Sequence, residues 1–293
     1  MYYEKIAVAI MSCALIATVV GASHRNWTAE AREPFHYTFS NDKTLDVDNV
    51  NGTIQVIGDN GNTIRAEGER IVRAEDQQAI DRAKRAADKE VKLDVNEKDG
   101  IAQFYVNGPF RDNGHSSDDH GFHIHSDEHE YEVTYNFNIH VPRETGLRLR
   151  SVNGEIKTEE TSGKFDVRGV NGSVTMTGIA GYGTLHTVNG RTTVSFRESP
   201  KAASDFQTVN GAIEASFPPN LSADLRFKTL NGQAYTDFDA TALLPSTAQA
   251  GDRTNGKFVY RTNHTSSVRI GSGGPELSFE TVNGDIRIKK ESR

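Results

Sequence analysis

Two spacings of apolar residues divide the chain. Most segments alternate apolar and polar residues, as in "FHYTFS" (35–40) and "YEVTYNFNIHVP" (131–142), and this alternation is typical of half-buried β-strands. The segment 74–90 differs, because it is rich in Ala, Glu, Lys and Arg and its apolar residues recur at helical spacing: Ala79, Ile80, Ala83, Ala86 and Ala87. The pattern predicts a mainly β chain with one helix near its N-terminal part.

A unit of three residues, Val-Asn-Gly or a close variant, recurs from residue 147 to the end of the chain. Its copies are centred on Asn153, Asn171, Asn189, Asn210, Asn231, Asn255 and Asn283, and an earlier copy is centred on Asn51. Apolar and polar residues alternate between the copies, and the alternation predicts an inward-facing set that includes Phe165, Val167, Val174, Met176, Phe206, Ile213, Ala215 and Phe217. One unit is therefore a strand, an Asn-Gly corner, a second strand and a second corner.

Two folds can use this unit. Asn-Gly is a strong hairpin signal, which favours an antiparallel meander or sandwich. A single motif repeated at intervals of 18 to 28 residues is instead typical of stacked rungs, so the expected fold is an all-β solenoid with one inserted helix.

In the solenoid, the Asn residues would lie at one corner in the left-handed conformation that Asn and Gly tolerate best. Their side chains would form a ladder of stacked amides, comprising Asn153, Asn171, Asn189, Asn210, Asn231 and Asn283. The preceding residues Val152, Val170, Val188 and Val209 are expected to form one inward column.

The stretch 141–196, which runs from "VPRETGLRLRSVNGEIKT" through "VRGVNGSVTM" to "LHTVNGRTTVSF", resembles the bacterial putative adhesin family. That family is a domain of unknown function with V-N-G-[DES]-[IV] repeats after a Val-Pro entry strand. The resemblance covers residues 35–293 and implies a right-handed single-stranded β-helix, an exported location and an adhesive or envelope role. It implies no catalytic residues, and the His-rich stretch described below departs from the family pattern.

The N-terminal segment predicts export. Lys5 precedes an uncharged apolar run (6–20) that ends in small residues, so residues 1–22 are expected to be a signal peptide or an N-terminal anchor. A linker (23–34), an N-terminal β part (35–146) and the continuous repeat region (147–293) would follow. Cys13 is the single cysteine, so disulfides and zinc-thiolate sites are not expected beyond it.

Half of the ten histidines fall in one polar segment (107–130), which is expected to be a long loop. They are His115, His120, His123, His125 and His129, interleaved with Asp and Glu. Imidazole and carboxylate groups suit Zn, Cu or Ni, so weak metal binding and a metal-buffering role are one interpretation. The alternative is a solvated loop whose histidines titrate near neutral pH.

Composition and charge exclude several functions. A net charge of −7 without a basic stripe argues against nucleic-acid binding, and no Gly-rich phosphate loop supports a nucleotide site. Outward charges alternate in sign, and no acid pair recurs at one rung position as a glycan-cleaving enzyme would need.

The sequence therefore predicts an exported, non-enzymatic protein of the bacterial periplasm, cell envelope or cell surface. It is expected to need no cofactor and to bind an envelope protein or glycan through a repetitive polar surface. The alternative is an envelope structural or stress-associated protein without an external ligand. Membrane contact is expected only through the N-terminal segment, if it is uncleaved.

Overall fold

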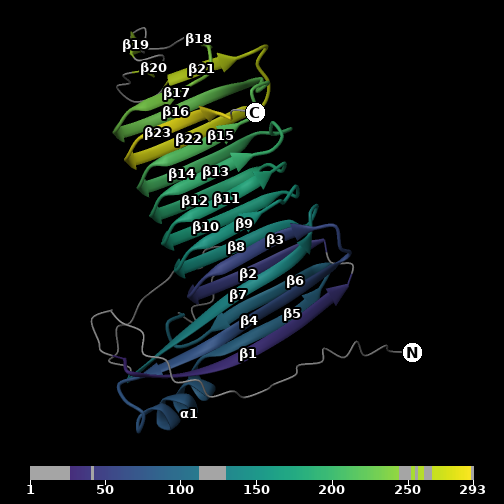
Figure 1. Cartoon of the computed structure of the whole chain (residues 1–293), viewed down its shortest axis with the longest axis vertical. Coiled ribbons are helices and arrows are strands. Elements are labelled where there is room, and N and C mark those ends of the chain that lie inside the picture. Colours follow the sequence, from purple (N-terminus) through teal and green to yellow (C-terminus); the bar gives the residue numbers. More distant parts are fainter. Residues whose placement is uncertain are drawn as a thin grey trace.

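The computed structural model describes residues 27–40, 43–111, 130–243, 252–254, 257–260 and 266–291. The prediction of an all-β fold is confirmed, since the strands form two large sheets and α1 (Ile80–Glu90) is the one helix in these ranges. The sheets face each other in a tall stack, with α1 at the end formed by the N-terminal half (Figure 1). Within the same ranges, no helix has the length and apolar character needed to cross a bilayer. The predicted signal peptide (1–22) lies outside the described residues.

The two sheets, A and B, each have a defined strand order. Sheet A contains, in order, β1 (Ala29–Ser40), β4 (Thr63–Ala74), β7 (Tyr131–Pro142), β3 (Ile54–Asp59), β9 (Ile156–Glu159), β11 (Val174–Ile179), β13 (Thr192–Phe196), β15 (Ile213–Phe217), β23 (Ile286–Lys290), β17 (Ala234–Thr236), β20 (Lys257–Tyr260) and β19 (Asp252–Thr254). Sheet B contains, in order, β18 (Ala240–Ala242), β21 (Ser266–Ile270), β16 (Ala223–Asn231), β22 (Glu276–Asn283), β14 (Ser204–Asn210), β12 (Gly183–Asn189), β10 (Phe165–Asn171), β8 (Gly146–Asn153), β2 (Thr44–Asn51), β6 (Ile101–Asn107) and β5 (Lys92–Lys98).

Each rung of the stack is a strand in sheet B followed by a strand in sheet A. From β8 to β15 the rungs pair in parallel and in register, so that Phe165 lies between Leu147 and Gly183. The chain therefore coils between the sheets, and this excludes the antiparallel alternative for these rungs. The handedness of the coil and its assignment to a single-stranded β-helix stay predictions.

The core lies between the sheets and is built from the residues that the alternation placed inward. All eight side chains of the expected inward set are buried, from Phe165 to Phe217. Aromatic rings stack from rung to rung, with centroids 4.8 Å apart for Phe196 and Phe217 and 5.1 Å apart for Phe206 and Phe279. Each buried ring of this kind stabilises the fold by about 1.5–3 kcal/mol.

The order of the rungs departs from the order of the sequence. The last rung, β22 and β23, lies between the β14–β15 rung and the β16–β17 rung, and Phe279 pairs with both Phe206 and Phe227. The yellow strands of the C-terminal segment accordingly lie among the green strands in Figure 1. After β15 the chain passes over one level of the stack, and β22 and β23 later occupy that level. Sequence alignment could not show this, because units with the same motif and alternation fit any neighbour equally well.

Antiparallel strands close both ends of the stack. β1, β4 and β7 pair antiparallel in sheet A, and β5 pairs antiparallel with β6 in sheet B. At the other end, β21 pairs antiparallel with β16 and β18, and β20 pairs antiparallel with β17 and β19. Among the described strands, antiparallel pairing is therefore confined to the ends of the stack.

Two predicted boundaries were wrong. The helix begins at Ile80 rather than at residue 74, because the Asp76 carboxylate accepts hydrogen bonds from the backbone N–H groups of Gln78 and Ala79 (2.9 and 2.8 Å) and forms the turn that precedes it. Residues 29–34, expected to be linker, instead form the first half of β1, because β4 supplies their hydrogen-bonding partners.

Candidate functional site

The first candidate site is the corner at which each sheet B strand ends. There the structure brings the six predicted Asn residues together with Asn51. In every step the Nδ2 of one Asn donates to the Oδ1 of the next, along the order Asn231, Asn283, Asn210, Asn189, Asn171, Asn153 and Asn51, at 2.7–3.0 Å. Asn283 therefore lies between Asn210 and Asn231 in the stack, and Asn255 lies outside the described residues. We call this column the Asn ladder.

Glycine, rather than a left-handed Asn, makes the corner possible. No residue of the Asn ladder has a positive φ, which corrects the expected conformation. The glycine after each Asn instead lies against the rung below: a Cβ on Gly190 would lie 2.2 Å from the carbonyl oxygen of Gly172, and one on Gly284 would lie 2.0 Å from that of Gly211. Only glycine permits this close backbone stacking.

Threonine occupies the inward position that was expected for valine. Thr208, Thr229 and Thr281 are buried, and the hydroxyl of Thr281 donates to the carbonyl oxygen of Gly211 at 3.0 Å. Because side chains alternate along a strand, an inward Thr208 places Val209 outward.

The expected inward valine column was therefore wrong. Val188 and Val209 are exposed (39% and 40%), Val170 is half-buried, and only Val152 is buried among the four. Leu230 occupies the equivalent position in β16 and is 64% exposed. We call the outward set the aliphatic column; it consists of Val170, Val188, Val209, Val282 and Leu230.

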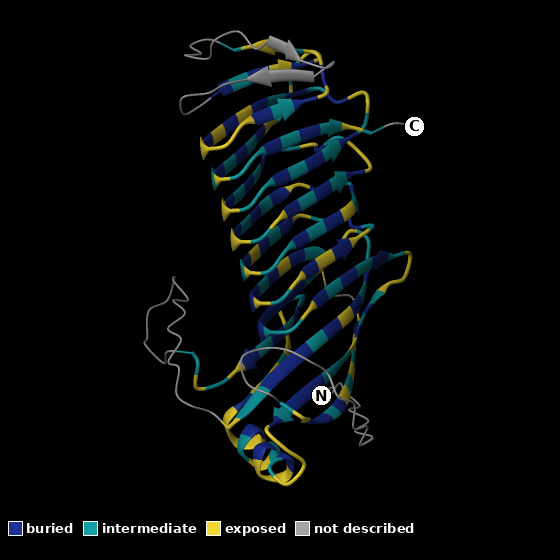
Figure 2. Cartoon of the chain, turned by 60° about the vertical axis from the view of Figure 1, so that its left-hand side comes forward, coloured by how far each residue is buried: buried dark blue, intermediate teal, exposed yellow. Residues whose placement is uncertain are grey.

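The Asn ladder and the aliphatic column run side by side along the stack, and exposed residues recur at the corners from rung to rung (Figure 2). An Asn side chain carries two N–H donors and two acceptor lone pairs. Each ladder bond uses one donor and one acceptor, so an interior Asn retains one of each for an external group. The corner can therefore offer hydrogen bonds and methyl groups at every rung.

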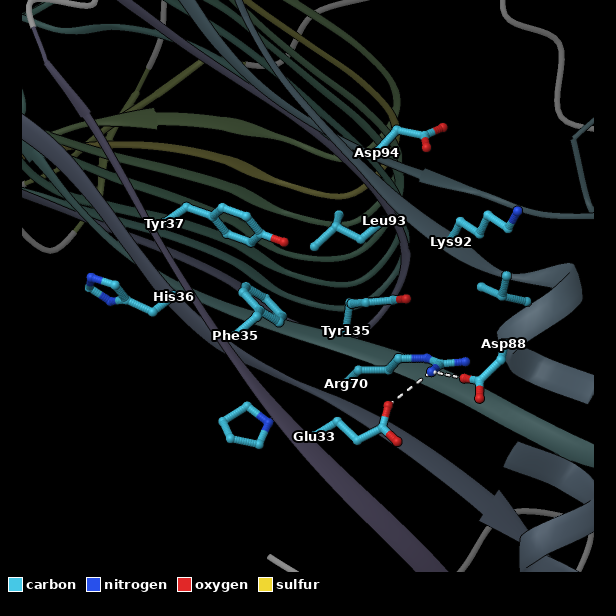
Figure 3. Close-up of a pocket in the computed structure, with 12 residues that line it drawn as sticks. Glu33, Phe35, His36, Tyr37, Arg70, Asp88, Lys92, Leu93, Asp94 and Tyr135 are labelled. Carbon is cyan, nitrogen blue, oxygen red and sulfur yellow. Dashed lines mark hydrogen bonds and ion pairs between the residues drawn. The ribbon is translucent and has the colours of Figure 1, made fainter. Parts of the chain in front are cut away.

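The second candidate site is a pocket of about 430 Å³ at the N-terminal end of the stack, within the size range of small-ligand sites. It lies between β1 and β5, the edge strands of the two sheets, and beside the end of α1 (Figure 3). Its lining residues are Glu33, Pro34, Phe35, His36, Tyr37, Arg70, Asp88, Val91, Lys92, Leu93, Asp94 and Tyr135. We call it the end pocket.

Arg70 and Glu33 are the buried charged residues of the end pocket, and they are 9% and 8% exposed. The Nη1 of Arg70 donates to Glu33 Oε2 (2.9 Å) and to Asp88 Oδ1 (2.5 Å), which ties α1 to β1 and β4. Burial lowers the pKa of Arg70, but the hydrogen bond that Arg70 donates to Asp88 and the nearby acidic groups outweigh this effect and raise the pKa. Nε and Nη2 are buried and have no hydrogen-bond partner among the described residues. A buried guanidinium with unpaired N–H donors is uncommon, because buried polar groups usually have hydrogen-bond partners.

Tyrosine hydroxyls complete the polar lining of the end pocket. Burial raises the pKa of Tyr135 to about 12 and also raises the pKa of Tyr37, so both phenols are neutral at physiological pH. Neither hydroxyl has a hydrogen-bond partner within the described part of the chain. The Phe35 ring lies 6.1 Å from that of Tyr37 and 6.3 Å from that of Tyr135, so aromatic faces line the same space.

Sequence reasoning missed the end pocket because its residues come from five separate elements. Two signals were present in the sequence. Arg70 occupies a position of β4 that is in phase with the apolar residues Ala66 and Val72, and Glu33 lies in the segment that was expected to be a linker. Neither residue alone predicts a pocket, because only the fold brings Arg70 and Glu33 into contact.

The predicted metal ligands His115, His120, His123, His125 and His129 lie outside the described residues. Within the described ranges, no three His, Cys, Asp or Glu side chains are grouped so that they could hold a metal ion. Zn, Cu or Ni binding by the His-rich segment stays a prediction.

Comparisons with known proteins leave the family open. No protein-family model and no curated protein matches the chain. One similar solved structure is that of a "putative cell adhesion protein" from Clostridium sporogenes; it is 10% identical, the match covers 88% of this chain and 100% of that chain, and the TM-score is 0.30. A likeness at this level supports no inference about function, and the resemblance to the V-N-G adhesin family stays a prediction.

Proposed function

We propose that this chain is an exported, non-enzymatic binding protein of the bacterial envelope, and that it engages a repetitive glycan or protein along the corner formed by the Asn ladder and the aliphatic column. The observation that carries this proposal is the register of the rungs. Parallel strands lie about 4.8 Å apart, so the corner repeats the same amide and methyl groups at that spacing. A partner with its own repeat can contact several rungs at once.

Multivalency lets weak contacts act together. Each exposed amide or methyl group contributes little alone, but a contact at one rung holds the partner close to the next rung and raises its effective concentration there. Exposed aliphatic residues in a continuous row are a common mark of an interaction surface.

The charges on the outer face of sheet B are largely paired with one another. Asp166 contacts Arg168 at 3.0 Å, Asp205 contacts His186 at 3.2 Å, and Lys228 contacts Glu280. Because these charges are paired within the protein, we assign the binding role to the uncharged amide and methyl groups of the corner.

Sedimentation of the full chain with bacterial envelopes, purified envelope polysaccharides and envelope protein extracts tests the proposal. The double variant Val188→Asp/Val209→Asp places charges in the aliphatic column without touching the core, and it should lose about tenfold in binding. The matched control Thr175→Asp/Thr177→Asp adds the same charge to the outer face of sheet A and should bind as the wild type does. Equal binding by both double variants would contradict the proposal. No binding across the panel would favour the envelope structural protein without an external ligand.

A further inference from the structure

We infer that the end pocket binds a neutral saccharide unit. The pocket lies at the N-terminal end of the stack and uses none of the residues of the Asn ladder or the aliphatic column. The inference goes beyond the proposed function, since it assigns a separate site and a ligand class, and neither proposal depends on the other.

The charges of the end pocket are balanced, which favours a neutral ligand. Three Arg or Lys side chains and three carboxylates lie in or directly beside it: Arg70, Lys84, Lys92, Glu33, Asp88 and Asp94. The imidazole of His36 also lines the pocket and lies 3.6 Å from the carboxylate of Glu67. Lys84 lies 2.9 Å from Glu33, and Glu33 also accepts from Arg70. An added anion would compete with Glu33 and Asp88, which are already paired with Arg70 and Lys84, and an added cation would compete with these bases. A ligand without net charge disturbs neither set.

The hydrogen-bonding groups of the end pocket match those of a sugar. Nε and Nη2 of Arg70 are unused donors, and the hydroxyls of Tyr37 and Tyr135 both donate and accept. The exposed carboxylate of Asp94 can accept a further bond from a ligand hydroxyl. A pyranose presents hydroxyls on several sides, so one ring can pair with donors and acceptors that lie on different elements.

The aromatic side chains supply the apolar half of the site. Phe35 and Tyr37 are half-buried in the pocket wall and belong to a ring cluster that also includes Tyr135 and Phe137, with Phe35 and Phe137 centroids 5.3 Å apart. Packing of this kind holds the rings in place before a ligand arrives, which reduces the entropy cost of binding. The C–H faces of a sugar ring can lie against such rings, while its hydroxyls reach the polar groups shown in Figure 3.

Calorimetry and saturation-transfer NMR on the full chain test the inference, with glucose, galactose and N-acetylglucosamine as neutral probes and glucuronate as an anionic comparator. At least one neutral probe should bind more tightly than glucuronate. Tyr37→Phe and Tyr135→Phe each remove a hydroxyl and keep the ring, so each should raise the Kd of that probe about fivefold, the loss of one neutral hydrogen bond. Tyr182→Phe, on an exposed side chain outside the pocket, should leave the Kd unchanged.

Three results would overturn the inference: no neutral probe binds, both pocket variants bind as the wild type does, or glucuronate binds more tightly than every neutral probe. Thermal melts of each variant establish that the fold is intact. The Val188→Asp/Val209→Asp variant should retain monosaccharide binding, so failure at the end pocket is distinguishable from failure at the corner.

Discussion

Each interior residue of the Asn ladder takes part in two side-chain hydrogen bonds, one as donor and one as acceptor. Asn189 donates to Asn171 and accepts from Asn210, whereas Asn231 donates to Asn283 and accepts from no other described residue. Water competes for these exposed amides, so the net stabilisation per bond is about 0.5–1.5 kcal/mol. Position in the ladder therefore sets the cost of losing an Asn.

Asn189→Ala should lower the free energy of unfolding by about 1–2 kcal/mol, because it removes two bonds, and Asn231→Ala by about half as much. Urea denaturation of both variants beside the wild type measures the difference. Equal losses, or losses within about 0.5 kcal/mol of zero, would show that the Asn ladder does not stabilise the stack.

Substitutions on the two faces of β14 should differ greatly in their effect on the free energy of unfolding. Phe206 is fully buried, so Phe206→Ala should cost about 3–5 kcal/mol, whereas Val209→Ser changes an exposed side chain and should stay within about 0.5 kcal/mol of the wild type. Thermal and urea denaturation measure both effects. A large loss for Val209→Ser would mean that the aliphatic column packs against something in the folded chain.

Strand alternation was sufficient to predict the core, since Phe165, Phe206 and Phe217 all lie where a period of two places them. The same rule places Val209 outward. The sequence interpretation failed there because it gave the apolar character of valine more weight than its position. Thr208 occupies the inward place because its hydroxyl can pair with a glycine carbonyl at the corner, although at 3.5 Å the pairing is loose. A motif of three residues does not show which of its members faces the core.

At the scale of elements, α1 and three strands of sheet A enclose buried ionisable groups. Arg70 on β4 holds Glu33 on β1 and Asp88 on α1, while Tyr135 on β7 lies against the same cluster. The sequence of any one of these elements does not predict the cluster, because the elements are irregularly spaced along the chain. The antiparallel pairing of β1, β4 and β7 brings the strand residues together, and α1 then supplies Asp88. The end pocket was therefore beyond reach of sequence patterns, whereas the strands that surround it were not.

Tyr135 should make the fold sensitive to alkali. Its pKa is raised by burial from 10 to about 12, so the folded state favours the neutral phenol. This contribution to stability is fully present below pH 10 and is lost as the pH rises toward 12. Urea midpoints measured across this range should fall, and Tyr135→Phe should fall less steeply. An identical slope in the variant would assign the alkaline loss to other groups.

At the scale of the whole molecule, the C-terminal rung joins the two parts of the stack that it separates. Leu277, Phe279, Ile286 and Ile288 are buried between the β14–β15 rung and the β16–β17 rung. In a stack ordered as the sequence is, a terminal rung has one neighbour. Here the last rung has two, so its removal exposes both.

Deletion of residues 276–293 should remove about 6–12 kcal/mol of apolar burial, comparable to the whole stability of many domains. We expect the truncated chain to lose cooperative unfolding and to become sensitive to protease over residues 204–236. Deletion of residues 291–293 alone is the matched control and should remain folded. Limited proteolysis and urea denaturation of both chains distinguish the cases, and a stable, cooperative 1–275 chain would show that the open level can close without β22 and β23.

The place of β22 and β23 has a consequence for the order of events during synthesis. A ribosome releases a chain from its N-terminus, so these strands emerge after every other rung exists. Until then β14 and β16 lack the strand that lies between them. A nascent or prematurely terminated chain therefore has unpaired strand edges on β14 and β16, which a quality-control protease can attack. The stack is therefore complete only after β22 and β23 have been synthesised.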